Sequence, residues 1–121
     1  MLPGKQAVRS AVRLLKGTRC HAVKLEGGQR MAAAIRAVVD AGIPVMGHVG
    51  LTPQTATALG AVAAQGRNAD AASRVAREAE ALQAAGCFLT VFEAIPSRVA
   101  EAIMPKMEIP VIGISILGMI A

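Results

Sequence analysis

Aromatic residues and cysteines are scarce in this sequence. It has no tryptophan, no tyrosine and two phenylalanines, so its core has to be built from aliphatic side chains and methionine. Proteins that bind single-stranded nucleic acid stack the bases on aromatic rings, which this composition does not supply. The two cysteines, Cys20 and Cys87, lie far apart and form no Cys-x-x-Cys pair. We therefore predict two reduced thiols in a protein of cytosolic type, with neither a disulfide framework nor a zinc site.

Long apolar runs and long runs of like charge are also missing. The apolar stretch at residues 109–121 is shorter than the ~20 residues that a transmembrane helix needs. Residues 1–13 are basic but lack the long apolar segment of a signal peptide. The net charge of +5 is dispersed, with no run of five like charges. We interpret it as solvated helix surface rather than as a nucleic-acid or membrane interface.

The chain that remains is aliphatic and large enough for one domain. Hydrophobic residues make up 54% of its 121 residues and charged residues 17%, which excludes a disordered tail. Segments with apolar positions at helical spacing alternate with short apolar runs that end at Gly or Pro. The predicted helices are residues 5–16, 29–41, 68 or 70 to 85, and 97–106; the predicted strands are residues 21–25, 43–49, 87–92 and 110–114.

This alternation predicts an α/β fold with a parallel sheet covered by helices. The periodicity suits two architectures, an open doubly wound sheet and a closed (β/α)8 barrel. An intact barrel needs about 250 residues, so the predicted strands would make half of one.

Charged or titratable side chains lie where several predicted strands end. In parallel α/β folds the carboxyl ends of the strands meet at one edge, where ligands bind. The sequence places a cation, an imidazole and two carboxylates at this edge: Lys24, Glu26, His48 and Glu93.

Each of these residues also has a less specific interpretation. Lys24 and Glu26 alternate along a strand and point to the same face, so a structural ion pair between them is one alternative. A lone histidine such as His48 is often a core residue with satisfied hydrogen bonds. Glu93 is harder to explain in this way, because burying a carboxylate at the end of an apolar strand is costly without a metal, a basic partner or a ligand.

Other chemistries lack their motifs. No Gly-x-Gly-x-x-Gly fingerprint, phosphate-binding P-loop or Gly-x-Ser-x-Gly elbow occurs, and a zinc site would need more His and Cys at suitable spacing. Carboxylates combined with a lysine favour a hard cation such as Mg²⁺.

Several motifs, in this order, resemble the ketopantoate hydroxymethyltransferase family. Residues 23–28 are similar to its Lys-x-Glu-Gly-Gly motif, and residues 47–54 to its Gly-His-x-Gly-Leu-Thr-Pro-Gln motif. Three further matches are the Gln-Gly-Arg turn at 65–67, the x-x-Glu-x-x-Pro strand end at 91–96 and the next strand at 110–114. The resemblance covers roughly residues 5 to 114.

This resemblance implies a (β/α)8 TIM barrel of the phosphoenolpyruvate/pyruvate type, of which the chain would supply strands four to seven. It implies transfer of a hydroxymethyl group from 5,10-methylenetetrahydrofolate to 3-methyl-2-oxobutanoate, giving 2-dehydropantoate for pantothenate and coenzyme A biosynthesis. Mg²⁺ would chelate the keto acid and act as a Lewis acid. It also implies small-molecule partners, a homo-oligomer when the barrel is complete, and a location in the cytoplasm or, in a eukaryote, the mitochondrion.

The resemblance also assigns roles to individual residues. Glu26 would bind the metal, directly or through water. Lys24 would pair with the keto-acid oxygens, and His48 would line the substrate pocket. Glu93 would be the catalytic acid and base, because a proton has to move while the carbon–carbon bond forms.

The sequence departs from the family pattern in two places. The family's metal-binding aspartates are on its second and third strands, before the part that this chain matches, so the metal site is expected to be incomplete. Residues 115–121 differ from the Gly-Ala-Gly continuation of the family. We expect residues 1–121 to form one partial barrel domain that departs from the family at 115–121, by a frameshift, an intron read-through or an altered gene end.

Two alternatives remain open at this point. One is a truncated, non-catalytic half-barrel that only binds or self-associates, because such a chain exposes sheet edges and apolar faces. The other is an aldolase-type barrel enzyme in which Lys24 forms a Schiff base with the substrate.

Overall fold

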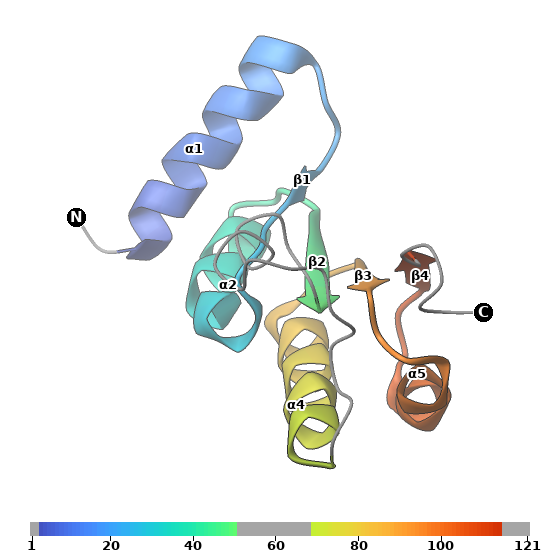
Figure 1. The fold of residues 1–121 in the computed structure, drawn as a ribbon. Coiled ribbons are helices and arrows are strands. Elements are labelled where there is room, and N and C mark those ends of the chain that lie inside the picture. Colours follow the sequence, from blue (N-terminus) through green and yellow to red (C-terminus); the bar gives the residue numbers. More distant parts are fainter. Residues whose placement is uncertain (1–2, 51–68, 115–121) are drawn as a thin grey trace, which may run out of the picture.

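The computed structural model describes residues 3–50 and 69–114, and helices alternate with strands along both segments (Figure 1). The order is α1 (Pro3–Thr18), β1 (Val23–Lys24), η1 (Gly28–Met31), α2 (Ala32–Asp40), β2 (Val45–Gly50), α4 (Ala69–Ala85), β3 (Leu89–Glu93), α5 (Ser97–Ile103), η2 (Met104–Lys106) and β4 (Val111–Ile114). Each predicted helix and strand is present. The motif residues predicted at 51–54 and 65–67 lie outside the described residues, as do residues 115–121.

The strands form one parallel sheet. Its spatial order is β1-β2-β3-β4, the order of the sequence. A doubly wound sheet reverses its strand order at a switch point, whereas a (β/α)8 barrel adds each strand beside the one before. The predicted α/β class is confirmed, and the strand order is that of part of a barrel.

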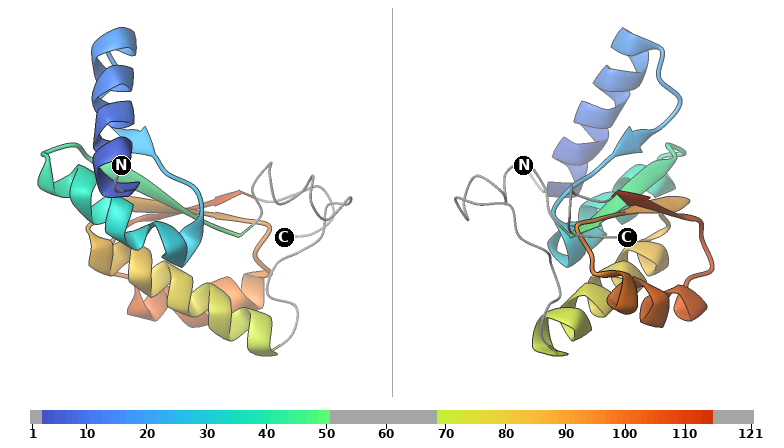
Figure 2. Two further views of the ribbon diagram at one scale, coloured as in Figure 1. Left: turned by 90° about the vertical axis from the view of Figure 1, so that its left-hand side faces the viewer. Right: turned by 45° about the vertical axis from the view of Figure 1, so that its right-hand side comes forward.

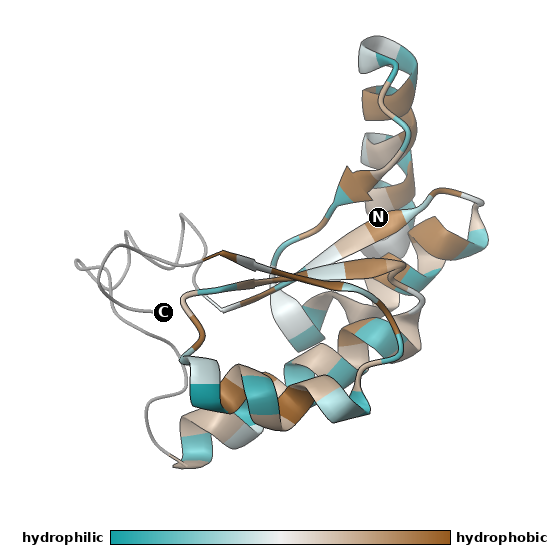
Figure 3. Ribbon diagram, turned by 90° about the vertical axis from the view of Figure 1, so that its right-hand side faces the viewer, coloured by the Kyte–Doolittle hydropathy of each residue, from teal (hydrophilic) through white to brown (hydrophobic). Residues whose placement is uncertain are grey.

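The helices lie mainly on one side of this sheet. Figure 2 shows α2, α4 and α5 along one face, with α1 extending beyond β1. The first helix contacts the second so closely that a Cβ on Gly4 would lie 3.1 Å from the Cβ of Ala37. In Figure 3 the strands are mostly hydrophobic, while α4 and α5 mix hydrophobic and hydrophilic residues. Each helix can therefore bury one side and expose the other.

The register of the strands assigns residues to the two faces. A Cβ on Gly47 would lie 3.0 Å from Cδ1 of Leu82, so Gly47 faces α4. Thr90 is its register partner and faces the same way. Side chains alternate along a strand, so His48 and Glu93 point to the other side. We call the side covered by the helices the helix face and the other side the opposite face.

The core lies between the helix face and the helices. Fully buried side chains come from both layers and from the segment after β3: Ile35, Val38, Val45, Val49, Leu82, Thr90 and Ile95. Burial of an aliphatic side chain contributes about 1.5–3 kcal/mol, so this layer is the main source of stability.

Hydrogen bonds of two side chains, Arg36 and Gln83, connect α4 to its neighbours. The guanidinium of Arg36 in α2 donates a hydrogen bond to the carbonyl of Ala84. The side-chain oxygen of Gln83 accepts hydrogen bonds from the backbone N–H of Glu108 at 2.7 Å and of Ile109 at 3.2 Å. Its amide nitrogen donates to the carbonyl of Lys106 at 3.4 Å. Gln83 therefore satisfies backbone groups in the connection that leads into β4.

The observed bounds differ from the predicted ones at β1 and at the start of α2. Strand β1 is two residues long rather than five, although pairing with β2 continues through a 3.1 Å hydrogen bond from the N–H of Leu25 to the carbonyl of Met46. The predicted helix at 29–41 begins as a 3₁₀ turn, η1. Among the described residues, no helix is long and apolar enough to cross a lipid bilayer.

Candidate functional site

The four predicted site residues lie at or near the carboxyl ends of the strands. Lys24 is the last residue of β1 and is exposed, and Glu26 follows two residues later and is half-buried. His48 lies within β2 with 2% of its surface exposed. Glu93 is the last residue of β3 and is half-buried.

Three of these residues share the opposite face of the sheet. Lys24 is the register partner of Met46, which lies two residues before His48 on β2. Gly50, two residues after His48, is the register partner of Glu93. Because side chains two apart on a strand share a face, Lys24, His48 and Glu93 all point away from the packed helices.

The structure joins His48 to Glu93. The Nε2 of His48 lies 3.4 Å from the Oε2 of Glu93. The His48 side chain is 1% exposed and the Glu93 side chain 26% exposed, so the imidazole is enclosed while the carboxylate reaches the surface. An enclosed imidazole this close to the Glu93 carboxylate restricts the orientations that the carboxylate can adopt.

The backbone at Glu93 is held between the ends of β2 and β4. Gly50 has a φ of 102°, and a Cβ at this position would lie 2.0 Å from the carbonyl oxygen of Glu93. The two strand ends therefore approach more closely than any other residue at position 50 would allow. On the other side, the N–H of Ala94 donates a 3.1 Å hydrogen bond to the carbonyl of Ile114 in β4.

Ala94 itself adopts a left-handed conformation. Its φ is 58° and its side chain is fully buried. This conformation costs an alanine about 1–2 kcal/mol, and such strain tends to occur at functional sites. The strained residue directly follows Glu93. Sequence patterns gave no signal for it, because alanine is not a turn residue.

Glu26 precedes a tight turn made by two glycines. Gly27 has a φ of 115° and Gly28 a φ of 61°, and Gly28 is buried. Lys24 and Glu26 form no ion pair within residues 3–50 and 69–114, so the structural pairing considered above is not seen there.

A residue that the sequence analysis did not single out lies against this turn. The carboxyl carbon of Glu78 in α4 is 3.0 Å from the position of a Cβ on Gly28. Burial raises the pKa of Glu78, and the nearby guanidinium groups of Arg74 and Arg30 partly offset the rise. In the sequence it is one of several charges on a helix, and only packing distinguishes it.

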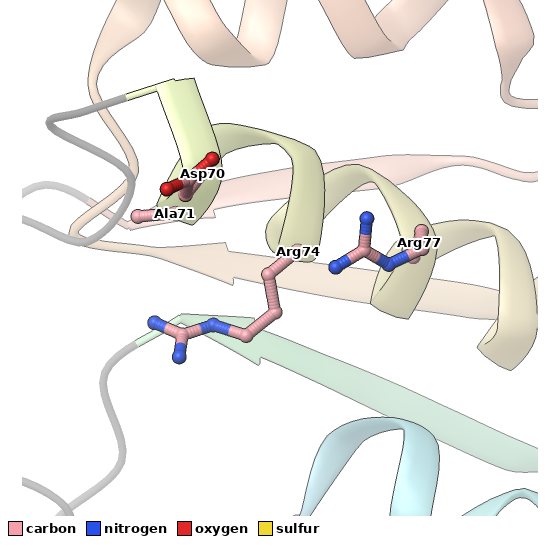
Figure 4. A pocket seen from close by; sticks show the side chains of 4 residues that line it. All are labelled: Asp70, Ala71, Arg74 and Arg77. Atoms are coloured by element: carbon pink, nitrogen blue, oxygen red, sulfur yellow. The ribbon is translucent and has the colours of Figure 1, made fainter.

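Two cavities lie near the strand ends and helices. One, of about 370 Å³, is lined by Asp70, Ala71, Arg74 and Arg77 at the start of α4 (Figure 4). The other, of about 460 Å³, lies between α1, β1 and α2, and it is mostly apolar with Lys24 and Arg30 among its lining residues.

The described residues fit a metal ion only in part. No group of three or more His, Cys, Asp or Glu side chains in the described segments could hold one. Glu26 offers a carboxylate of the type that Mg²⁺ prefers, but a complete set of oxygen ligands is not present there.

Comparison with known proteins gives the family. The sequence model described as ketopantoate hydroxymethyltransferase matches residues 3–116, nearly the whole chain. The chain belongs to the ketopantoate hydroxymethyltransferase family. The resemblance predicted from the motifs is therefore confirmed.

Relatives in this family carry the name 3-methyl-2-oxobutanoate hydroxymethyltransferase. The protein from Heliobacterium modesticaldum is 52% identical over 110 residues, which are 91% of this chain and 40% of the relative. Those from Oleidesulfovibrio alaskensis and Emericella nidulans are 53% and 46% identical, over 90% and 91% of this chain and 38% and 32% of their own lengths. The chain thus spans about a third to two fifths of the hydroxymethyltransferases that it matches.

Proposed function

We propose that this chain is the part of a 3-methyl-2-oxobutanoate hydroxymethyltransferase that supplies the acid–base group. The reaction transfers a one-carbon unit from 5,10-methylenetetrahydrofolate to 3-methyl-2-oxobutanoate, with one water consumed, and yields 2-dehydropantoate and tetrahydrofolate. The observation that carries the proposal is the contact between His48 and Glu93, 3.4 Å apart at the edge where ligands bind in such folds.

Glu93 is the proposed catalytic residue. C3 of the keto acid lies next to a carbonyl, so removal of its proton gives an enolate. Hydrolysis of 5,10-methylenetetrahydrofolate by the one water breaks both C–N bonds to the one-carbon unit and releases tetrahydrofolate and formaldehyde. The Glu93 carboxylate accepts the C3 proton, and the electron pair of the C–H bond becomes the enolate. C3 then adds to the carbon of formaldehyde, whose C=O electron pair moves to the oxygen. Glu93 afterwards returns a proton to the oxygen of the new hydroxymethyl group. A side chain that is 26% exposed and in contact with His48 suits both transfers.

The other residues hold Glu93 and the substrate. The Nε2 of His48 lies 3.4 Å from the Glu93 carboxylate, and His48 would line the substrate pocket. Lys24 is an exposed cation on the same face, suited to the carboxylate of the keto acid. Mg²⁺, which the resemblance implies, would polarise the keto oxygen when bound, and Glu26 would supply one ligand, directly or through water.

The same proposal includes the extent of the domain, the oligomeric state and the location of the complete enzyme. We take residues 1–121 as one partial barrel domain that departs from the family at 115–121. We expect the complete enzyme to be a homo-oligomer, in the cytoplasm or, in a eukaryote, the mitochondrion.

The proposal is tested by proton exchange at the keto acid. The chain is incubated with 3-methyl-2-oxobutanoate and Mg²⁺ in deuterium oxide, and loss of the C3 proton is followed by NMR, beside an assay of 2-dehydropantoate formation. Glu93→Gln should slow exchange by about 10²–10⁴-fold, because it removes the base. Glu80→Gln is the matched control, since Glu80 is an exposed carboxylate whose ion pair with Lys106 spans 3.7 Å.

Other outcomes would identify the alternatives. Exchange that is unchanged in Glu93→Gln would exclude the role of Glu93. A chain that self-associates but catalyses neither exchange nor product formation would be the non-catalytic half-barrel. Borohydride trapping of the keto acid on Lys24 would instead identify a Schiff-base enzyme.

A further inference from the structure

The turn that follows Glu26 is supported from outside the sheet by a carboxylate. Gly28 has a φ of 61° and is buried. The position of a Cβ on Gly28 lies 3.0 Å from both Cδ and Oε1 of Glu78 and 3.3 Å from its Oε2. The whole carboxylate of Glu78 therefore lies against the Cα of Gly28, and a side chain at position 28 would have to displace it.

We propose that Glu78 is a positioning residue for Glu26, acting by holding the Gly27–Gly28 turn in place from helix α4. This inference rests on the proposed function, in which Glu26 would supply a ligand to the Mg²⁺ that binds the keto acid. Glu78 contacts the backbone of the turn and forms no ion pair with the other candidate site residues in the described part of the chain, so the role assigned to it is positioning rather than catalysis.

Glu78 differs from other charged residues on α4 in its burial and in the charges that surround it. It is half-buried, whereas Glu80, two residues later on the same helix, is exposed. Arg30, in the 3₁₀ turn η1, and Arg74, one turn earlier in α4, are the cationic groups that act on its charge. The charges of Arg30 on η1 and Arg74 on α4 both act on this carboxylate, so it interacts electrostatically with both elements.

Besides Glu78, the Met31 side chain packs against this turn, with its Cγ 2.6 Å from the position of a Cβ on Gly27. Strand β1 ends at Lys24, so Glu26 and the glycines lie beyond the regular ladder. Two successive glycines give the backbone wide conformational freedom. A contact from α4 restricts that freedom, and partners of this kind affect ligand affinity about 10–100-fold in metal sites.

The experiment separates turn geometry from ligand binding. Backbone amide resonances of the ¹⁵N-labelled chain are recorded without ligand for the wild type, Glu78→Gln, Glu78→Asp and the control Glu80→Gln. The affinity for 3-methyl-2-oxobutanoate with Mg²⁺ present is then measured by isothermal titration calorimetry. Glu78→Gln removes the charge, and Glu78→Asp keeps the charge but withdraws the carboxylate from Gly28.

Both Glu78 variants should shift the amide resonances of Glu26, Gly27 and Gly28 and weaken keto-acid binding by about tenfold or more. Glu80→Gln should leave both the amide resonances of the turn and the affinity unchanged. The variants are compared only if their thermal unfolding midpoints are similar. If Glu78→Gln does not fold, the amide shifts and the affinity of Glu78→Asp decide the test. Shifts confined to α4, with affinity equal to that of the control, would overturn the inference. If the wild type binds no keto acid, the proposed function fails, and the amide shifts alone decide whether Glu78 holds the turn.

Discussion

The two faces of the same sheet differ in what covers them and in what they carry. On the helix face, Val45, Val49 and Phe92 are at most 3% exposed and pack against helices. On the opposite face, His48 and Glu93 form a polar contact. Farther along that face, Ile112 and Ile114 are 46% and 41% exposed.

This difference follows from the two-residue repeat of a strand. Every second residue faces the helices and stabilises the fold, and the residues between them are free to carry chemistry. For side chains, the separation of the faces predicts that changes on the helix face alter stability, whereas changes on the opposite face alter binding and catalysis. A contact between strand backbones, such as that at Gly50, affects stability on either face. The following experiments test that separation.

Gly50→Ala should have the largest effect on stability, although position 50 faces away from the helices. The new methyl group would lie 2.0 Å from the carbonyl oxygen of Glu93, at a φ of 102°. We expect a loss of about 3 kcal/mol or more in the free energy of unfolding, measured with urea. Gly113→Ala is the control, because a Cβ there meets no atom within 4 Å. Equal losses in both variants would show that the Gly50–Glu93 contact is not essential.

Cys87 should make the helix face sensitive to high pH. Burial raises the pKa of its thiol from 9.0 to about 11. The unfolded chain therefore ionises first, so the contribution is complete below pH 9 and is lost as the pH rises through about 11. We expect the free energy of unfolding to fall by about 2–3 kcal/mol over this range.

The fall in the free energy of unfolding at high pH should be absent in Cys87→Ala and remain in Cys20→Ala. Urea unfolding at several pH values measures it, and the sequence has no tyrosine that would ionise in the same range. A loss of the same size in Cys87→Ala would contradict the assignment to this thiol.

Gln83→Ala should loosen the connection into β4. The variant loses the acceptor for the N–H groups of Glu108 and Ile109, and we expect about 1–2 kcal/mol of destabilisation by urea unfolding. Hydrogen exchange of those amides should accelerate more than exchange in β2. Uniform acceleration throughout the sheet would indicate that Gln83 acts on global stability rather than on this connection.

Thr90→Val should change the stability least, and it should increase the free energy of unfolding instead of lowering it. Thr90 is fully buried on the helix face, and its hydroxyl has no hydrogen-bond partner within the described part of the chain. Replacing that hydroxyl by a methyl group of similar size should stabilise the fold by about 1 kcal/mol, seen as a higher urea midpoint. Thr18→Val is the control, since the exposed Thr18 hydroxyl donates a 2.6 Å hydrogen bond to Leu14. Destabilisation by Thr90→Val would mean that the hydroxyl is hydrogen-bonded in solution.

The fold was predictable because its signals are local. Helical spacing in α4 buries Val75, Ala79 and Leu82, and the glycine at position 86 ends that helix. The α/β class and the family follow from such patterns and from the motifs. The two-residue length of β1 and the 3₁₀ start before α2 were not predictable, because they depend on pairing with β2 and on the turn at Gly27.

The candidate site was predictable only as a set of residue types. The sequence put Lys24, Glu26, His48 and Glu93 at strand ends, and their roles remain a prediction. It gave no sign of Glu78, and none of the left-handed Ala94.

The sequence by itself determined which segments become helices and strands, which family the chain belongs to, and which polar residues end the strands. These properties depend on periodicity and on short motifs within single segments. Only the tertiary structure decided that His48 meets Glu93 at 3.4 Å, that Gly50 approaches the backbone of β3, and that Glu78 lies against the turn after Glu26. Each of these contacts joins residues far apart in the chain, and the register of the strands and the packing of α4 bring them together.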